Sequence, residues 1–118
     1  MITLKTLPEA TAQEVFEQVA KHLIKQNDKS IDYGLCKYKN VRLTCAAGCL
    51  IGDNEYNEER MERNSWITLV KEKLVPKNHS DLICDLQKVH DNKDVDKWKE
   101  ELTKVAIAHN LDYSFLNN

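Results

Sequence analysis

TAQEVFEQVAKHLIKQN, residues 11–27, is the stretch that decides the class of fold. Thr11 and Glu14 fit a capping box, in which each side chain accepts a hydrogen bond from a backbone N–H that a helix start leaves free. The apolar residues recur at the i, i+3, i+4, i+7 spacing that gathers them on one helix face. They are Ala12, Val15, Phe16, Val19, Ala20, Leu23 and Ile24. The stretch therefore predicts an amphipathic helix with one buried face.

Three later segments carry the same period and predict three further helices. The first begins after Asn64 or Ser65 and ends before Pro76, since a proline disfavours helix at the residue before it. The other two run from Ser80 to His90 and from Val95 to His109, and Asn110 fits a left-handed stop after the last. We expect the apolar tail 111–116 to pack onto the body of the protein.

Between residues 30 and 51 the helical period is lost. Tyr33-Gly34 fits a turn, and 36–38 and 41–45 fit the two strands of one hairpin with Lys39-Asn40 as its turn. The small residues of 45–51 predict a tight helical turn that packs close to another backbone and ends at Gly52. The fold class is thus predicted as mainly α (α+β), with four helices, a small hairpin and an irregular cysteine-bearing insert after the first helix.

Length and charge limit the class of protein. The 118 residues fit a single domain, 1–118, and 17 basic against 19 acidic residues give a net charge of -2, which argues against broad nucleic-acid binding. No apolar run is long enough to span a membrane, and the start of the chain does not fit a signal peptide. We therefore expect a cytoplasmic protein with reduced cysteines. No heptad pattern predicts a homo-oligomer, which stays open.

Cys36, Cys45 and Cys49 are the candidate metal ligands. Thiolates bind zinc, but structural zinc sites use closely spaced cysteine pairs, and only Cys45 and Cys49 approach that spacing. Small thiols buried in a tightly packed corner are the favoured interpretation, and a zinc-stabilised structural module is the alternative. The candidates for a fourth ligand are His79, His90 and His109.

Catalytic signatures are weak. Cysteine catalysis needs a nearby base and an environment that stabilises the thiolate, and no local motif pairs a histidine with a cysteine here. His90-Asp91 is typical of metal-dependent phosphohydrolases, but those enzymes need further His and Asp ligands, and this chain has too few. We favour a non-enzymatic protein and keep an enzyme with a Cys-His or His-Asp pair as the alternative.

Two sets of charged and aromatic residues flank the cysteines. Phosphate or nucleotide binding uses a few cations with aromatic faces and needs no overall positive charge, although an ordinary exposed hairpin explains the same residues. The candidate ligand-binding residues are Lys29, Tyr38, Arg42, Asp53 and Tyr56. A run of glutamates follows, either as a solvated helix face or as a contact surface for a basic partner. Its members are Glu55, Glu58, Glu59 and Glu62.

Two motifs carry a family resemblance. The segments CKYK, residues 36–39, and CAAGCLIGDNEY, residues 45–56, resemble the Cys-x-Tyr-Arg and Cys-Ala-x-Gly-x-Leu-Ile motifs of small proteins from tailed phages and scattered bacterial genomes. LQKVHD, residues 86–91, and Trp98 complete the pattern, which covers about residues 10 to 110. Lys39 stands where the group often has arginine, which weakens a bidentate anion contact. Gly52 stands where proline is frequent, and the group does not always have cysteine at Cys49, which weakens the zinc interpretation.

The resemblance implies a setting rather than a reaction, because the group has no settled activity. The leading hypothesis is a small non-enzymatic phage accessory protein that binds a host component in the bacterial cytosol and inhibits a host protein or an antiviral defence system. A protein partner would meet the acidic segment. The alternative is a sponge that sequesters a small nucleotide signal at the candidate ligand-binding residues.

Overall fold

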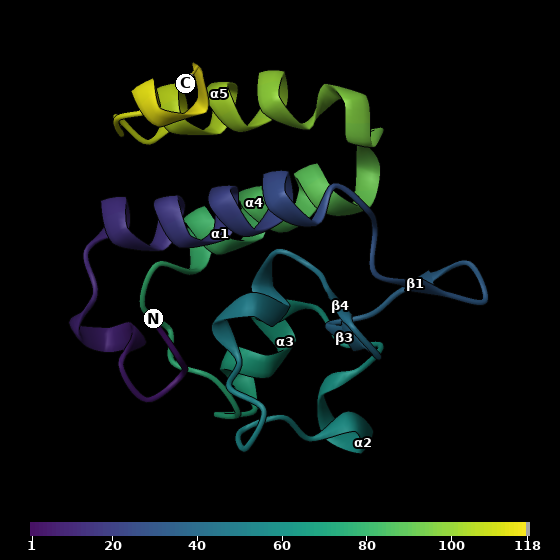
Figure 1. Ribbon diagram of the computed structural model, residues 1–118. Helices are drawn as coiled ribbons and strands as arrows, with labels where there is room; N and C mark the ends of the chain where they lie inside the picture. The colour runs from purple at the N-terminus through teal and green to yellow at the C-terminus, as the bar shows by residue number, and fades with distance from the viewer. Residues whose placement is uncertain (118) are drawn as a thin grey trace.

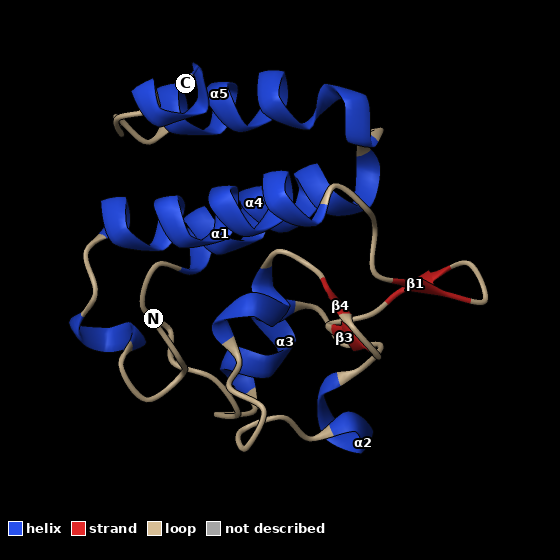
Figure 2. Ribbon diagram, in the orientation of Figure 1, coloured by secondary structure: helices blue, strands red, loops and turns tan. Residues whose placement is uncertain are grey.

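Helices dominate the structure, a computed structural model that describes residues 1–117 (Figures 1 and 2). The α-helices are α1 (Ala12–Gln26), α2 (Glu58–Met61), α3 (Trp66–Lys71), α4 (Ser80–Asn92) and α5 (Trp98–Ala108). Short 3-10 helices are η1 (Leu7–Glu9), η2 (Ala47–Leu50), η3 (Val95–Lys97) and η4 (Ser114–Asn117). Asn118, the last residue of the predicted domain, lies outside the described residues.

The predicted class, helical with a small β component, is confirmed, but its element count is wrong. The described residues form five α-helices rather than four, because α2 forms within the acidic segment, where the Asn57 side chain accepts a hydrogen bond from the Arg60 N–H. α3 is shorter than predicted: it ends at Lys71, and Lys73 is already left-handed with φ 60°. None of the helices within residues 1–117 has the length and apolar character needed to cross a membrane.

α1 forms as its sequence predicts. Thr11 Oγ1 accepts the Glu14 N–H at 3.1 Å and Glu14 Oε1 accepts the Thr11 N–H at 2.8 Å, which completes the capping box. The helix ends at left-handed Asn27, and its buried face packs against α4, α5 and η2. Figure 1 shows α1, α4 and α5 side by side, with the insert, α2 and α3 below them. The predicted docking of the tail is confirmed, since Phe115 meets Phe16 edge-on at 5.8 Å.

The insert contains two hairpins rather than one. β1 (Ile31–Asp32) pairs with β2 (Leu35–Cys36) across the predicted Tyr33-Gly34 turn, and β3 (Lys39–Asn40) pairs with β4 (Leu43–Thr44). The prediction of a turn at Lys39-Asn40 is wrong: these residues are a strand, and the turn lies at Val41-Arg42. Val41 has φ 55°, a conformation that β-branched residues rarely adopt. A valine at this position therefore favours a strand in the sequence, and it does not predict the turn. The β1–β2 hairpin projects from the body, as the red arrows in Figure 2 show.

η2 confirms the predicted close approach of two backbones. Gly48 is buried, and a Cβ atom built on it would lie 2.0 Å from the carbonyl oxygen of Tyr38. η2 also contacts α1, α4 and β4. Only glycine at this position allows the start of the second hairpin to lie against the helical layer.

Gly48→Ala is expected to destabilise the fold by about 3 kcal/mol or more, because the added methyl group overlaps the Tyr38 carbonyl and main chain must move. The free energy of unfolding from urea denaturation measures this. Gly34→Ala is the control: its added Cβ meets no atom within 4 Å, and only its left-handed backbone is strained, at a cost of about 1 kcal/mol. Equal effects of the two substitutions would contradict the close contact.

Candidate functional site

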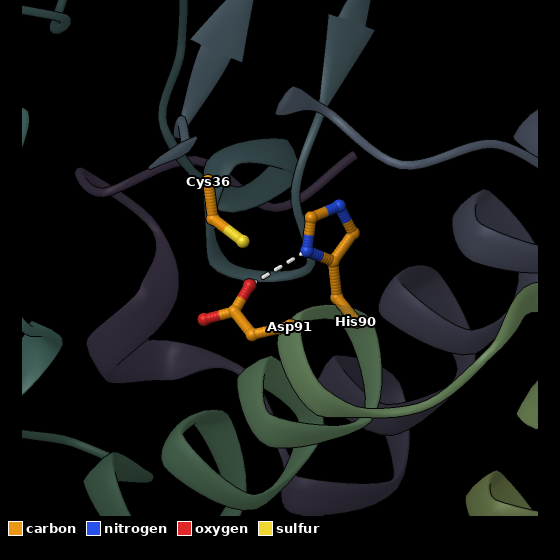
Figure 3. Close-up of side chains that lie close together, drawn as sticks. All are labelled: Cys36, His90 and Asp91. Atoms are coloured by element: carbon orange, nitrogen blue, oxygen red, sulfur yellow. Dashed lines mark hydrogen bonds and ion pairs between the residues drawn. The ribbon is translucent and has the colours of Figure 1, made fainter. Parts of the chain in front are cut away.

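One cluster of metal-binding and nucleophilic side chains stands out in the described part of the chain. Cys36 on β2 and His90 and Asp91 near the end of α4 each offer one donor atom, and these atoms lie within 4.8 Å of one another. Figure 3 shows the Cys36 thiol pointing towards the Asp91 carboxylate, which a dashed line joins to the His90 imidazole. The sequence offers His90 as one of three possible fourth ligands beside the cysteines, but it does not place Asp91 with Cys36, because no spacing joins segments that are 54 positions apart (90 minus 36).

His90 uses both ring nitrogens inside the fold. Its side chain is fully buried, its Nε2 accepts the backbone N–H of Ser30 at 2.9 Å, and its Nδ1–H donates to Asp91 Oδ1 at 2.7 Å. Since Nε2 faces a donor, the partners assign the proton to Nδ1. No nitrogen of this ring is left to accept a proton from the Cys36 thiol.

Asp91 extends these contacts into a polar chain. Its Oδ1 also accepts from Gln87 Nε2 at 2.8 Å, and Gln87 Oε1 accepts the Ala47 N–H at 2.8 Å. The chain joins α4 to η2 and, through His90, to the residue before β1. Buried backbone N–H groups need such partners, so the cluster first serves to hold the insert on α4.

The cluster fits zinc poorly. A metal bound at His90 Nδ1 would leave the ring proton on Nε2, against the Ser30 N–H, and a structural zinc site needs four ligands where three donors are present. The predicted ligand set is not assembled either. Cys45 is buried with its Sγ accepting the Gly48 N–H, and within residues 1–117 neither it nor Cys49 joins Cys36 in a donor cluster. All four cysteines are free thiols.

The environment of Cys36 opposes nucleophilic catalysis. Burial, together with the charge and hydrogen bond of Asp91, raises the pKa of the Cys36 thiol to about 11. Burial also raises the pKa of Cys49 to about 12 and moves that of Cys45 upward. An activated cysteine needs the opposite shift, towards thiolate near neutral pH.

The predicted ligand-binding residues are not gathered around one opening. Tyr38 is buried, its hydroxyl donates to the Asn64 carbonyl at 2.6 Å, and its ring meets Trp66 edge-on at 6.4 Å. Tyr56 donates its hydroxyl to Glu62, and Asp53 pairs with Lys39 at 3.2 Å. Arg42 is exposed in the β3–β4 turn, and Lys29 precedes β1. Both aromatic rings of the set thus serve the fold.

The predicted acidic contact surface divides into two pairs, because Glu55 and Glu62 turn inward. Glu62 is buried and accepts the N–H groups of Tyr38 and Lys39 at 3.0 and 3.2 Å. Burial, followed by the hydrogen bond and charge of Glu62, raises the pKa of Tyr56. A partner-binding role for these two glutamates stays a prediction; within the fold their oxygens already accept from main-chain donors and, at Glu62, from the Tyr56 hydroxyl.

Glu55 makes three such bonds, accepting N–H groups from Leu4, Lys5 and Gly52 at 2.8 to 3.0 Å. Burial alone would raise the pKa of the Glu55 carboxyl, but the three backbone donors lower it below its ordinary value. Glu55 therefore fixes the amino-terminal segment and the turn after η2.

Glu58 and Glu59 remain exposed on α2, and no ion pair or side-chain hydrogen bond engages them within residues 1–117. They line a cavity of about 330 Å³ together with Tyr33 and Leu35 of the β1–β2 hairpin. The side chain of Tyr33 is 98% exposed and that of Leu35 is 55% exposed. These two residues are not among the candidates named from the sequence. The predicted turn at Tyr33-Gly34 was the one signal for them, because a turn between two strands leaves its aromatic ring exposed at the tip.

Comparison with protein-family models, with curated proteins and with solved structures finds no match to this chain. The resemblance to phage and bacterial proteins stays a prediction from the motifs, and the site is interpreted from its own chemistry.

Glu62→Gln is expected to lower the free energy of unfolding by about 2 kcal/mol, because a neutral amide replaces a buried carboxylate that three donors share. Chemical denaturation at neutral pH measures the loss. The matched control is Glu59→Gln, which changes an exposed carboxylate on the same segment and should stay within about 0.5 kcal/mol. A neutral Glu62→Gln would show that the three hydrogen bonds add nothing to stability.

Cys36 should react slowly with iodoacetamide at pH 8 and faster as the pH rises towards 11, since only the thiolate attacks. Asp91→Asn removes a charge that raises the pKa of Cys36 and should speed its alkylation. Peptide mapping by mass spectrometry follows each cysteine separately. Cys84 is the internal control, because burial and the charges of Asp81 and Asp85, not Asp91, raise its pKa. Rapid alkylation of Cys36 at neutral pH would revive a nucleophilic role.

Proposed function

We propose that this chain is a non-catalytic binding protein that engages a partner protein through its hairpin–α2 surface. This surface consists of Ile31, Tyr33, Leu35, Glu58 and Glu59. The observation that carries the proposal is the projecting β1–β2 hairpin, whose apolar side chains are exposed beside two glutamates that have no ion-pair partner among the described residues.

Exposed apolar side chains on this hairpin do little for the fold itself. Two strands of two residues bury little surface, and an isolated hairpin is at best marginally stable in water. Tyrosine is enriched among residues that dominate protein interfaces, since it buries a large ring at low entropic cost. Tyr33 at the tip therefore suits contact with another protein better than contact with its own chain.

The charges favour one kind of partner. Asp32 lies 3.8 Å from Lys37, whereas Glu58 and Glu59 have no such cation within the described residues. A segment with an apolar side chain and a neighbouring lysine or arginine would complement the surface, placing the apolar group on Tyr33 and Leu35 and its cation on the glutamates.

The setting follows from the resemblance to phage-encoded proteins. In that setting the partner is a protein of the bacterial host, and binding inhibits it or an antiviral defence system of which it is part. The high pKa of Cys36 and the saturated His90 support binding over catalysis. Within residues 1–117, Cys45 and Cys49 do not join Cys36 in one donor cluster, which does not favour the zinc module. The five candidate ligand-binding residues lie apart, which does not favour a nucleotide sponge that binds through them.

The proposal is tested by affinity capture from a bacterial lysate with quantitative mass spectrometry. Wild-type protein is compared with Tyr33→Ser and with the double variant Glu58→Lys/Glu59→Lys. Both are expected to lose specific host proteins by about tenfold or more, since one removes the aromatic contact and the other reverses the charge. Glu100→Lys, an exposed glutamate on α5, is the matched control and should retain them.

Captured proteins that are equally abundant with all four samples would contradict the hairpin–α2 surface as the binding site. Circular dichroism of each variant separates a lost contact from a lost fold, because all four substituted side chains are exposed.

A further inference from the structure

A second cavity, larger than the one at the hairpin–α2 surface, adjoins it at Cys36 of β2. Its volume is about 530 Å³, and its lining comes from β2, α3, α4 and the segments next to them. This volume falls within the range of roughly 300–1,000 Å³ that is usual for small-molecule sites. The polar chain at His90 contributes Gln87 and Asp91 to the lining, but the proposed partner binding does not use this cavity.

The floor of the cavity is apolar and aromatic. Tyr38 and Trp66 line it together with Ile67 and the thiols of Cys36 and Cys84. Trp66 is 2% exposed, and its indole N–H is the one buried side-chain polar group of residues 1–117 that has no hydrogen-bond partner. Leaving such a donor unsatisfied costs about 1–3 kcal/mol, so a buried orphan beside a cavity needs an explanation.

The polar groups of the cavity combine excess positive charge with one carboxylate. Lys37, Arg63 and Lys88 line it, against Asp91 alone. The Oδ1 atom of Asp91 accepts from His90 and Gln87, and the carboxylate also receives the Cys36 thiol, which leaves further lone pairs of its two oxygens for a ligand. A ligand could thus find an acceptor for an N–H, a donor in the indole of Trp66, and cations for a negative group.

We propose that this cavity binds a small planar nitrogen heteroaromatic that carries an anionic group. The ring lies on the apolar floor, a nitrogen or oxygen of the heterocycle accepts the Trp66 indole N–H, and an N–H of the heterocycle, in the ring or on an amino group, donates to Asp91. The anionic group lies towards the exposed Arg63 and Lys88. Nucleoside monophosphates and orotate each carry such an acceptor, such an N–H and an anionic group, and they stand for two sources, nucleotides and heteroaromatic acids.

The cavity also shares wall residues with the hairpin–α2 surface. Cys36, Lys37 and Arg63 line both openings. A ligand in the larger cavity therefore contacts β2, the strand that supports the projecting hairpin. The cavity and the hairpin–α2 surface are separate sites that share these three wall residues.

The test is a titration of ¹⁵N-labelled protein, followed through its two tryptophan indole N–H resonances. The probes are AMP, GMP, CMP, UMP and orotate, each up to about 5 mM, with adenosine as the uncharged comparison; this range detects the weak affinities typical of unoptimised small ligands. The Trp66 resonance should shift downfield as it gains an acceptor. Trp98 is the internal control, because its indole already donates to the Lys93 carbonyl at 3.2 Å. Trp66→Phe assigns the two signals.

Lys88→Glu should weaken binding by about tenfold, as expected for reversing a cation beside an anionic group. Lys99→Glu, which reverses an exposed cation on α5, should leave it unchanged. A response to the monophosphates alone or to orotate alone supports the site and identifies the source. No Trp66 shift with any probe, equal shifts of both tryptophans, or binding insensitive to Lys88→Glu would overturn the proposal.

Discussion

The carboxylate of Glu62 is the contact on which the arrangement of the insert depends. It accepts the main-chain donors of Tyr38 and Lys39 and the hydroxyl of Tyr56, so one buried side chain fixes the start of β3 and the segment after η2 together. With residue 38 held there, its carbonyl lies over Gly48 and its ring against Trp66. The second hairpin, η2 and the floor of the larger cavity all follow from this position.

The polar chain through His90 performs the corresponding task on the helical side. A buried histidine close to an aspartate and a cysteine suggests a metal centre or a catalytic triad, but the hydrogen bonds decide otherwise. Both imidazole nitrogens are occupied, and burial, followed by the charge and hydrogen bond of Asp91, raises the pKa of the Cys36 thiol where activation would need it lowered. Residue types alone are therefore weak signs of chemistry, because the same groups satisfy buried backbone donors when an irregular insert must be held on a helix.

The insert combines a rigid base with exposed tips, which suits a binding protein. Glu62 and His90 fix its base, while the Tyr33-Gly34 tip projects beyond the reach of both. The proposed partner surface and the proposed ligand cavity adjoin at β2, with Cys36, Lys37 and Arg63 common to their walls. Adjacent sites that share a strand offer a physical route by which one occupant could influence the other.

The sequence by itself determined the features that depend on local spacing: the amphipathic α1 with its capping box, the helical periods of α4 and α5, the left-handed stop at Asn110 and the close approach at Gly48. These follow from contacts a few residues apart, or from the absence of a Cβ atom. Only the tertiary structure decided which glutamates face solvent, where the second hairpin turns, and that Cys36 meets Asp91 rather than Cys45 or Cys49. The physical reason is that these outcomes depend on hydrogen-bond partners distant in the chain. The same spacing of glutamates is compatible with a solvated helix face and with buried carboxylates that accept hydrogen bonds from distant backbone N–H groups.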